Sequence, residues 1–300
     1  MRTPIHTQLQ SGQPLWYVGR ECRILWGVLV YDLSATIVPG LLFAVAAWHT
    51  PVGMSRSLFE VLGQAGLYLL LYALVFCVPN QIVGIAEDRL NKPTRPLPSG
   101  MLTVRGAWVR WGVAMFLFTL LGWWWQVLPW VVLWQVTSLI HNLGHGDRHY
   151  VTKNLAMCAG VIAQLAGVWS LVAPLTLTVW TWITVPALSM LMHVSVQDLR
   201  DTVGDHVVGR RTLPLVIGWK HSRYLLAVAF LALPVGSQLI LFAPAGVTLS
   251  EWVCSGLLTG CCLVIAGRLY WYAAPEAQQC TYMLFTYWYC LLLASAIILL

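Results

Sequence analysis

The sequence has very few charged residues. Only 9% of its 300 residues are Asp, Glu, Lys or Arg, whereas a soluble domain carries about 25%. Apolar residues make up 59% of the chain, and the mean hydropathy is +0.72. This composition excludes an ordinary soluble protein. It predicts an all-α integral membrane protein, whose natural partner is the lipid bilayer.

Paired cysteines are also missing, and we expect no cleavable leader before the first apolar segment. The eight cysteines form no Cys-x-x-Cys pair and mostly lie in apolar segments, where cysteine behaves as a small apolar residue. The sequence therefore indicates neither a metal cage nor a disulfide framework. Residues 1–24 are largely polar, and we interpret them as a cytoplasmic N-terminal arm. Residues 25–300 are expected to form a single transmembrane domain.

Apolar segments recur along the rest of the chain. A helical span needs about 20 mostly apolar residues, and on that basis we predict nine spans. They are Leu25–Trp48, Phe59–Pro79, Ala107–Gln126, Val127–Leu143, Asn154–Val172, Leu175–Val196, Tyr224–Phe242, Trp252–Tyr272 and Tyr282–Leu300.

The cations favour one side of this arrangement. Alternation across the membrane places all but one of the 17 Lys and Arg residues on the same side, the exception being Arg56. Because Lys and Arg mark the cytoplasmic side, the N-terminus and the charged connections are predicted to be cytoplasmic. The net charge of +6 mostly reflects this bias. We therefore expect no nucleic-acid partner, and no obligate protein partner is evident.

An acidic motif, QDLRDTVGDHVVGRRTLP, follows the sixth span within the loop 197–223. If that helix continues through Gln197, then Asp198, Asp201 and Asp205 share one face at i, i+3 and i+7. Three carboxylates so placed repel one another unless a cation is supplied. Mg²⁺ prefers oxygen ligands of this kind, and the planar guanidinium of Arg210 suits a phosphate.

A related stretch, NQIVGIAEDRLNKPTRPLPSG, follows the second span within the loop 80–106. On a helix Asn80, Gly84 and Asp88 share a face, with Glu87 beside them. Asp88 is the expected metal ligand, with Glu87 second, and Asn80 offers an amide to a metal or a phosphate. Two such motifs facing one cavity would clamp a diphosphate from both sides.

These two stretches resemble the UbiA superfamily of intramembrane prenyl-diphosphate enzymes, whose signatures are roughly N-D-x-x-D-x-x-x-D and D-x-x-D-x-x-G-D. NKPTRPLPSG and GRRTLP extend the resemblance. It implies a helical ring around a central cavity, two or three Mg²⁺ ions and an isoprenyl diphosphate bound at the cytoplasmic side. The implied catalytic residues are Asn80, Glu87, Asp88, Asp198, Asp201 and Asp205, all except Asn80 as metal ligands. The implied substrate-binding residues are Asn80, Gln81, Lys92, Arg95, Arg148, Lys153 and Arg210.

The first motif departs from the common pattern, because Gln81 and Gly84 stand where most prenyltransferases of the superfamily carry acids. The resulting N-Q-x-x-G-x-x-E-D is similar to the terpene cyclase branch, as is DRHYVTKN at 147–154. We therefore predict a Mg²⁺-dependent membrane terpene cyclase that converts a linear farnesyl or geranylgeranyl diphosphate to a cyclic terpene. The first alternative is a prenyltransferase with an aromatic or lipid acceptor. The second is a transporter of an anionic lipid.

Two further features stay open at this point. Asp32 lies within the predicted first span, where an acid is costly; it could assist the site, pair with a buried cation or cap a turn. A group of tryptophans, Trp123, Trp124, Trp125, Trp130 and Trp134, crowds the third and fourth spans. They could line a chamber for a carbocation, but an aromatic belt at the membrane interface is the favoured interpretation.

Overall fold

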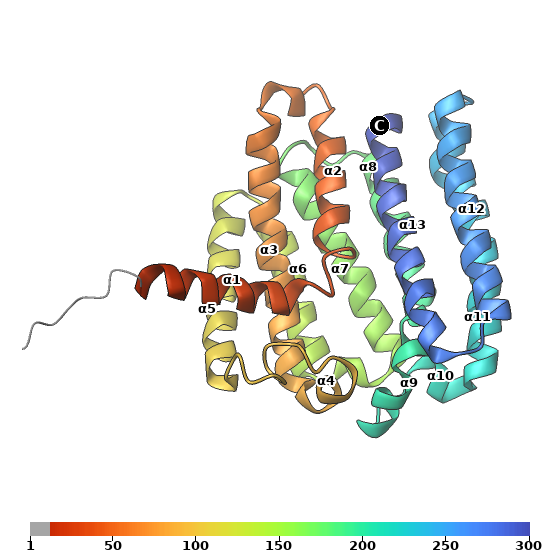
Figure 1. Ribbon diagram of the computed structural model, residues 1–300. Helices are drawn as coiled ribbons and strands as arrows, with labels where there is room; N and C mark the ends of the chain where they lie inside the picture. The colour runs from red at the N-terminus through yellow and green to blue at the C-terminus, as the bar shows by residue number, and fades with distance from the viewer. Residues whose placement is uncertain (1–12) are drawn as a thin grey trace, which may run out of the picture.

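The protein is a bundle of helices that run roughly alongside one another (Figure 1). The computed structural model describes residues 13–300, and no extended strand occurs in that range. The helices that form the bundle are α2 (Ile37–Trp48), α3 (Leu58–Val83), α5 (Val104–Trp124), α6 (Leu128–Ser138), α7 (Tyr150–Ser170), α8 (Leu177–His193), α11 (Trp219–Ser237), α12 (Leu249–Trp271) and α13 (Gln278–Leu299). The predicted all-α fold class is confirmed for the described residues.

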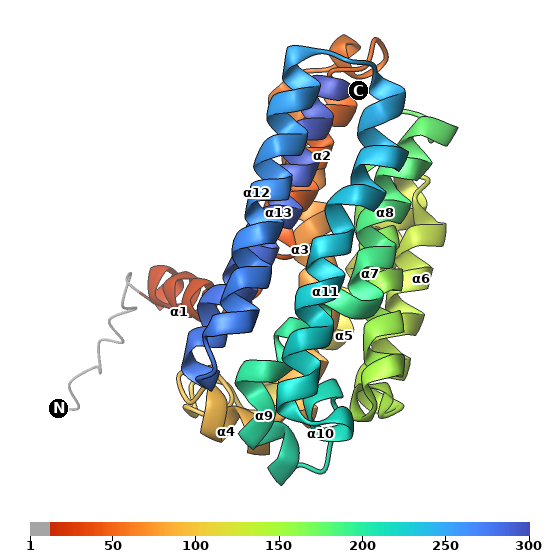
Figure 2. The ribbon, with the colours of Figure 1, turned by 90° about the vertical axis from the view of Figure 1, so that its right-hand side faces the viewer.

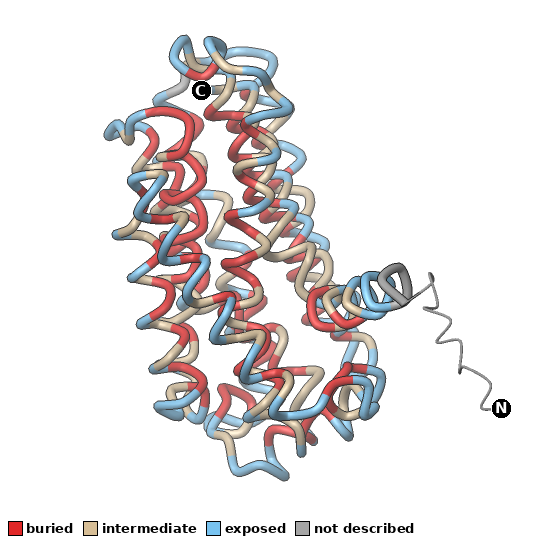
Figure 3. Tube along the Cα trace, turned by 90° about the vertical axis from the view of Figure 1, so that its left-hand side faces the viewer, coloured by how far each residue is buried: buried red, intermediate tan, exposed pale blue. Residues whose placement is uncertain are grey.

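Seven of the described helical segments are long and apolar enough to cross a membrane. They are Leu58–Val83, Val104–Trp124, Tyr150–Ser170, Leu177–Val196, Trp219–Phe242, Leu249–Trp271 and Pro275–Leu299. Exposed residues gather on the outward sides of the helices and buried ones inside the bundle (Figure 3). Helices α2 and α6 have only 12 and 11 residues, although a π-helical turn, Leu139–Leu143, extends α6. A count of nine spans therefore stays a prediction.

The first predicted span, Leu25–Trp48, is not one helix, and that prediction is wrong. Helix α1 (Gln13–Leu29) runs across the bundle, and a series of turns separates it from α2 (Figure 1). The turn is closed by Thr36, whose hydroxyl and backbone N–H both donate to the Asp32 carbonyl at 2.6 and 3.0 Å. The boundary expected at residue 24 thus falls inside α1, and residues 1–12 of the expected arm lie outside the described residues.

Small residues on α7 allow large side chains to pack closely. A Cβ at Gly160 would lie 2.6 Å from the Trp134 ring, and one at Gly167 would overlap the hydroxyl of Tyr68. That hydroxyl donates to the Ala163 carbonyl at 2.9 Å. Without a hydrophobic drive between helices inside lipid, such close contacts supply much of the packing energy. Helix α7 therefore fixes Tyr68 and Trp134 in the centre of the bundle.

The two predicted motif loops are largely helical and lie at one end of the bundle. They contain α4 (Ile85–Asn91), α9 (Asp198–Val207) and α10 (Leu213–Ile217), which gather below the long helices in Figure 2. Helices α4 and α9 touch where Gly204 faces Asn91, because any side chain at Gly204 would overlap the Asn91 amide. The two acidic motifs, more than 100 residues apart in sequence, thus meet through a glycine contact.

Candidate active site

A cavity of about 820 Å³ lies between the two motifs and the inner faces of the long helices. Part of its wall is polar and charged and comes from both motifs and the loop between α6 and α7. These residues are Asn80, Glu87, Asp88, Lys92, Arg95, Asp147, Lys153, Arg200, Asp201, Asp205 and Arg210. The rest of the wall is mostly apolar or aromatic. It includes Tyr72, Phe76, Trp134, Met157, Val161, Tyr282, Phe285 and Tyr289.

The first motif begins where a proline opens the hydrogen-bond ladder of α3. Pro79 has no N–H, so the Val75 carbonyl lacks its usual helical partner. It accepts instead from the Ser138 hydroxyl at 2.9 Å and the Trp111 indole at 3.1 Å. These bonds tie the last turns of α3 to neighbouring helices. They hold Asn80, the next residue, at the cavity wall.

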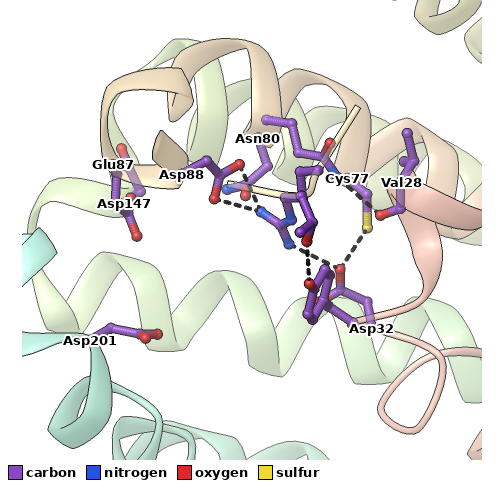
Figure 4. Close-up of polar contacts among 12 residues, drawn as sticks. Val28, Asp32, Cys77, Asn80, Glu87, Asp88, Asp147 and Asp201 are labelled. Atoms are coloured by element: carbon purple, nitrogen blue, oxygen red, sulfur yellow. Dashed lines mark hydrogen bonds and ion pairs between the residues drawn. The ribbon is translucent and has the colours of Figure 1, made fainter. Parts of the chain in front are cut away.

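The side chains of Asn80 and Gln81 point in different directions. The Asn80 amide lines the cavity and donates to Asn142 Oδ1 at 3.2 Å. The Gln81 amide is buried outside the cavity wall and donates to the Val28 carbonyl of α1 at 2.9 Å (Figure 4). The structure therefore places Asn80 with the other predicted site residues and gives Gln81 a contact with α1 instead.

Arg95 connects the first motif to the turn between α1 and α2. Its Nη1 donates to both carboxylate oxygens of Asp88, at 2.9 and 3.0 Å, and its Nη2 lies 3.5 Å from Asp32 Oδ2 (Figure 4). The guanidinium also sits 5.5 Å from the Tyr31 ring centroid. Asp32 therefore lines the cavity as the partner of a buried cation, one of the roles left open by the sequence.

The second motif is set off from its span by a short 3₁₀ segment. Residues Val194–Val196 form a 3₁₀ turn between α8 and α9, and α9 begins at Asp198 and carries all three acids on one helix, as their spacing predicted. Each acid has a cation. Lys153 pairs with Asp198, and Arg200 pairs with Asp201 at 3.2 Å. Asp198 itself is fully buried behind Lys153 and does not line the cavity.

Arg210 joins three separate parts of the site. Its Nη1 lies 2.5 Å from Glu87 Oε2 of the first motif and 3.2 Å from Asp205 Oδ1 of the second. Its Nη2 and Nε donate to Asp147 Oδ2 at 2.7 and 3.0 Å. Asp147 belongs to neither motif and was not among the predicted site residues. The only sequence signal for it is an acid immediately before the basic stretch of DRHYVTKN.

Arg148 lies outside the cavity wall. Its side chain is exposed, and its backbone carbonyl accepts from the Arg211 N–H at 2.6 Å. Tyr150 N–H in turn donates to the Arg211 carbonyl at 3.0 Å. These two bonds hold the loop after α6 against the segment after α9. Lys153, in the first turn of α7, does line the cavity, as does Lys92 of the first motif.

Burial alters the acidity of the charged groups. It raises the pKa of Glu87 above its ordinary value against the lowering effect of Arg210, and it raises the pKa of Asp198 to about 6 against the effect of Lys153. For Arg210, burial lowers the pKa, but its three carboxylate partners outweigh that effect and raise it overall. Buried carboxylates of this kind need a cation close by.

The donor set suits a hard divalent cation. No three His, Cys, Asp or Glu side chains among the described residues already converge as a cage. Three buried carboxylate oxygens, however, have no hydrogen-bond partner: Asp147 Oδ1, Asp198 Oδ2 and Asp205 Oδ2. Mg²⁺ is usually held by one or two carboxylates, with water and substrate phosphate completing the shell. The residues present therefore fit Mg²⁺ bound together with a diphosphate.

Stacked rings form part of the aromatic wall. Trp134 stacks on Tyr72 with centroids 4.5 Å apart and on Phe76 at 5.0 Å. The Tyr289 hydroxyl is 3.0 Å from Gln164 Oε1 inside the cavity. Trp123 and Trp124 are instead 65% and 72% exposed, consistent with an interfacial belt. The tryptophan group thus divides, and only Trp134 of its members lines this cavity.

The chain belongs to the UbiA prenyltransferase family, whose model matches residues 33–291. The family was thus correctly identified from the two motifs. Solved structures agree on the fold. A UbiA homologue from Archaeoglobus fulgidus bound to GPP and Mg²⁺ superimposes with a TM-score of 0.65 at 13% identity, over 93% of this chain and 99% of that one.

Curated relatives divide between two activities. The chain is 38% identical to a somaliensene A/B synthase from Streptomyces somaliensis, covering 93% of this chain and 94% of that protein. It is 36% identical to the diterpene cyclase eriG from Hericium erinaceus, covering 92% and 88%. A polyprenyl transferase, eriF, from the same fungus is 32% identical, covering 92% and 94%.

Proposed function

We propose that the protein is a membrane terpene cyclase that ionises a linear isoprenyl diphosphate and releases a cyclic terpene and diphosphate. The observation that carries this proposal is the cavity itself, which joins both acidic motifs to a wall of stacked aromatic rings. The similarity to a somaliensene synthase and a diterpene cyclase supports the same activity. Magnesium is proposed by fit to the carboxylates and because a UbiA homologue binds it.

The polar wall would bind the diphosphate. We assign the divalent cations to Glu87, Asp88, Asp201 and Asp205 at the cavity wall and to Asp198 behind it, whose Oδ2 has no hydrogen-bond partner. The diphosphate contacts are assigned to Asn80, Lys92, Arg95, Lys153 and Arg210. Bound Mg²⁺ would stabilise the charge that develops on the leaving diphosphate. Arginine suits this role because its planar fork meets phosphate oxygens in pairs.

The aromatic wall would hold the prenyl chain after ionisation. Tyr72, Phe76 and Trp134 line the cavity, and an aromatic face turned toward a carbocation would attract it by about 2 kcal/mol or more when water is excluded. A dry apolar chamber keeps the carbocation from water, so that it reacts with its own double bonds. Ring closure thus needs no second substrate.

A prenyltransferase is the second candidate function, and the eriF relative favours it. Gly84 argues against it, because this cavity-lining position has no side chain that could position or deprotonate an acceptor. The test is to give detergent-purified protein farnesyl or geranylgeranyl diphosphate with Mg²⁺ and no acceptor. Mass spectrometry should detect a cyclic hydrocarbon or alcohol. A prenylated conjugate that forms only when an acceptor is added would establish the transferase instead.

We further propose nine spans, with α2 and α6 as the two short ones, and a cytoplasmic site. In that topology all but one of the 17 Lys and Arg residues of the sequence would lie on the side of the motifs, and the exception is Arg56, which pairs with Glu60. Cysteines introduced at Thr94 and Thr202, in a chain without the exposed Cys22 and Cys280, should react with an impermeant thiol reagent only from the cytoplasm. Labelling from opposite sides would contradict both the topology and the shared site.

A further inference from the structure

Each of two cavity arginines has a carboxylate partner that belongs to neither motif. Arg210 binds Glu87 and Asp205 of the motifs and, in addition, Asp147. Arg95 binds Asp88 of the first motif and, in addition, lies next to Asp32. The motif acids are the ones assigned to a divalent cation above. The additional acids are not among these assigned ligands, and each of them contacts one of the two arginines.

The two edges of the Arg210 guanidinium contact different partners. Nε and Nη2, on one edge, both donate to Asp147 Oδ2 at 3.0 and 2.7 Å. Nη1 faces the motifs, with Glu87 at 2.5 Å and Asp205 at 3.2 Å. Because the fork is planar and rigid, gripping one edge fixes the direction of the other. The contact with Asp147 therefore helps to fix the direction in which Nη1 points, toward the motif acids.

The contact between Asp147 and Arg210 does not depend on the motif carboxylates. Asp147 lies on a 3₁₀ turn, Gly146–Arg148, beside the segment that carries Arg210. Backbone hydrogen bonds from Arg211 N–H to the Arg148 carbonyl, and from Tyr150 N–H to the Arg211 carbonyl, fasten the two segments together. The acid and the arginine are thus kept adjacent by main-chain hydrogen bonds between the residues that directly follow each of them.

A divalent cation that takes Glu87 and Asp205 competes with Nη1 for the same oxygens. A buried guanidinium left with no carboxylate would carry a large desolvation cost. We propose that Asp147 is a positioning residue that keeps Arg210 paired in the cavity when a divalent cation takes its two motif partners, so that Nη1 turns to the diphosphate. This inference rests on the proposed function only in taking diphosphate as the ligand.

The ion pair between Asp32 and Arg95 is weaker than the one between Asp147 and Arg210, and it provides an internal comparison. Its single contact is 3.5 Å long, and the Asp32 side chain is 33% exposed, against 10% for Asp147. Water reaches Asp32 more easily and can replace it as a partner of the arginine. Removing the charge of Asp32 should therefore matter less than removing that of Asp147.

The test measures Mg²⁺ binding in purified full-length protein, by titration calorimetry in the presence of inorganic diphosphate. Asp147→Asn keeps the side-chain volume and removes the charge. It should raise the half-saturating Mg²⁺ concentration by about tenfold or more, whereas the matched variant Asp32→Asn should raise it by no more than about threefold. Asp147→Glu, which keeps the carboxylate, should stay closer to the wild type than Asp147→Asn. If Asp147→Asn does not fold, the Mg²⁺ affinity of Asp147→Glu is measured in its place.

A double-mutant cycle separates positioning from a general structural effect. If Asp147 acts through Arg210, then Asp147→Asn should have no further effect on Mg²⁺ binding in an Arg210→Gln background. An equal shift in both backgrounds, or an unchanged Mg²⁺ affinity in Asp147→Asn, would overturn the proposal. The binding readout needs no turnover. It therefore stays valid whether the enzyme proves to be a cyclase or a transferase.

Discussion

The two acidic motifs sit at equivalent places, each following a long helix, but they are built differently. The second motif places three carboxylates on the single helix α9, each paired with a cation. The first is split between the end of α3 and α4 by Gly84, and its Gln81 turns away to α1. The second motif thus concentrates its carboxylates on one helix. The first supplies two acids, an amide and the cations Lys92 and Arg95.

The largest expected effect comes from removing one carboxylate of either motif. Asp88→Ala and Asp198→Ala should each lower kcat by about 100-fold or more, since a metal ligand contributes several kcal/mol of leaving-group stabilisation. Steady-state assays of diphosphate release measure this. Thermal unfolding confirms that each variant is folded.

Glu60→Gln is the matched control, because that exposed acid pairs with Arg56 away from the cavity. It should leave kcat unchanged. Turnover that survives EDTA, or near-normal rates in both aspartate variants, would show that the motifs do not share a metal-dependent site.

Substitutions at the adjacent residues Asn80 and Gln81 test whether the first motif places one amide at the cavity and the other against α1. Asn80→Ala removes an amide from the cavity wall and should lower kcat/KM by about 10-fold or more, as expected for a hydrogen bond to a charged group. Gln81→Ala should change kcat/KM by less than about threefold. It should instead lower the free energy of unfolding by about 1 kcal/mol, because it loses the bond to the Val28 carbonyl.

A larger kinetic effect at Gln81 than at Asn80 would reverse this assignment. It would mean that the Gln81 amide leaves α1 and reaches the substrate. The substrate-binding role predicted for Gln81 from the sequence would then hold.

A smaller effect than at the motif acids or Asn80 is expected at Gly84. A Cβ there would lie 2.9 Å from the Asn80 carbonyl and 3.8 Å from Glu87 Oε2. Gly84→Asp should slow cyclisation several-fold by adding a charge where the cation forms in a dry cavity, without creating transferase activity. Gly84→Ala separates this charge effect from crowding and should be milder. A prenylated conjugate from Gly84→Asp, analysed by mass spectrometry, would show that this one position decides between the two reactions.

Much of the fold and the site could be predicted because membrane helices and metal motifs leave strong local signals. Apolar runs of about 20 residues have few alternatives to a spanning helix, and seven of the nine predicted spans overlap the central part of a helix long enough to cross. The acids of α9 are spaced for one helical face, so their shared face follows from the helical period alone, whereas the sequence does not reveal that only Asp201 and Asp205 line the cavity.

The sequence could not reveal contacts that depend on tertiary geometry. Asp147 is an ordinary loop acid until the backbone bonds between Arg148, Tyr150 and Arg211 bring it to Arg210. Gln81 and Asn80 are adjacent amides, and only the position of α1 decides which one leaves the cavity. The break near Asp32 was obscured because the apolar residues on both sides of it read as one continuous span.

The central claim, that ring closure needs no acceptor, is tested most directly by stoichiometry. Purified protein is given one equivalent or less of isoprenyl diphosphate with Mg²⁺, with and without an aromatic acceptor, and diphosphate and organic products are both quantified. The account predicts one cyclic terpene per diphosphate released, at the same rate in both samples. Diphosphate release that depends on the acceptor and yields a conjugate in equal amount would contradict it.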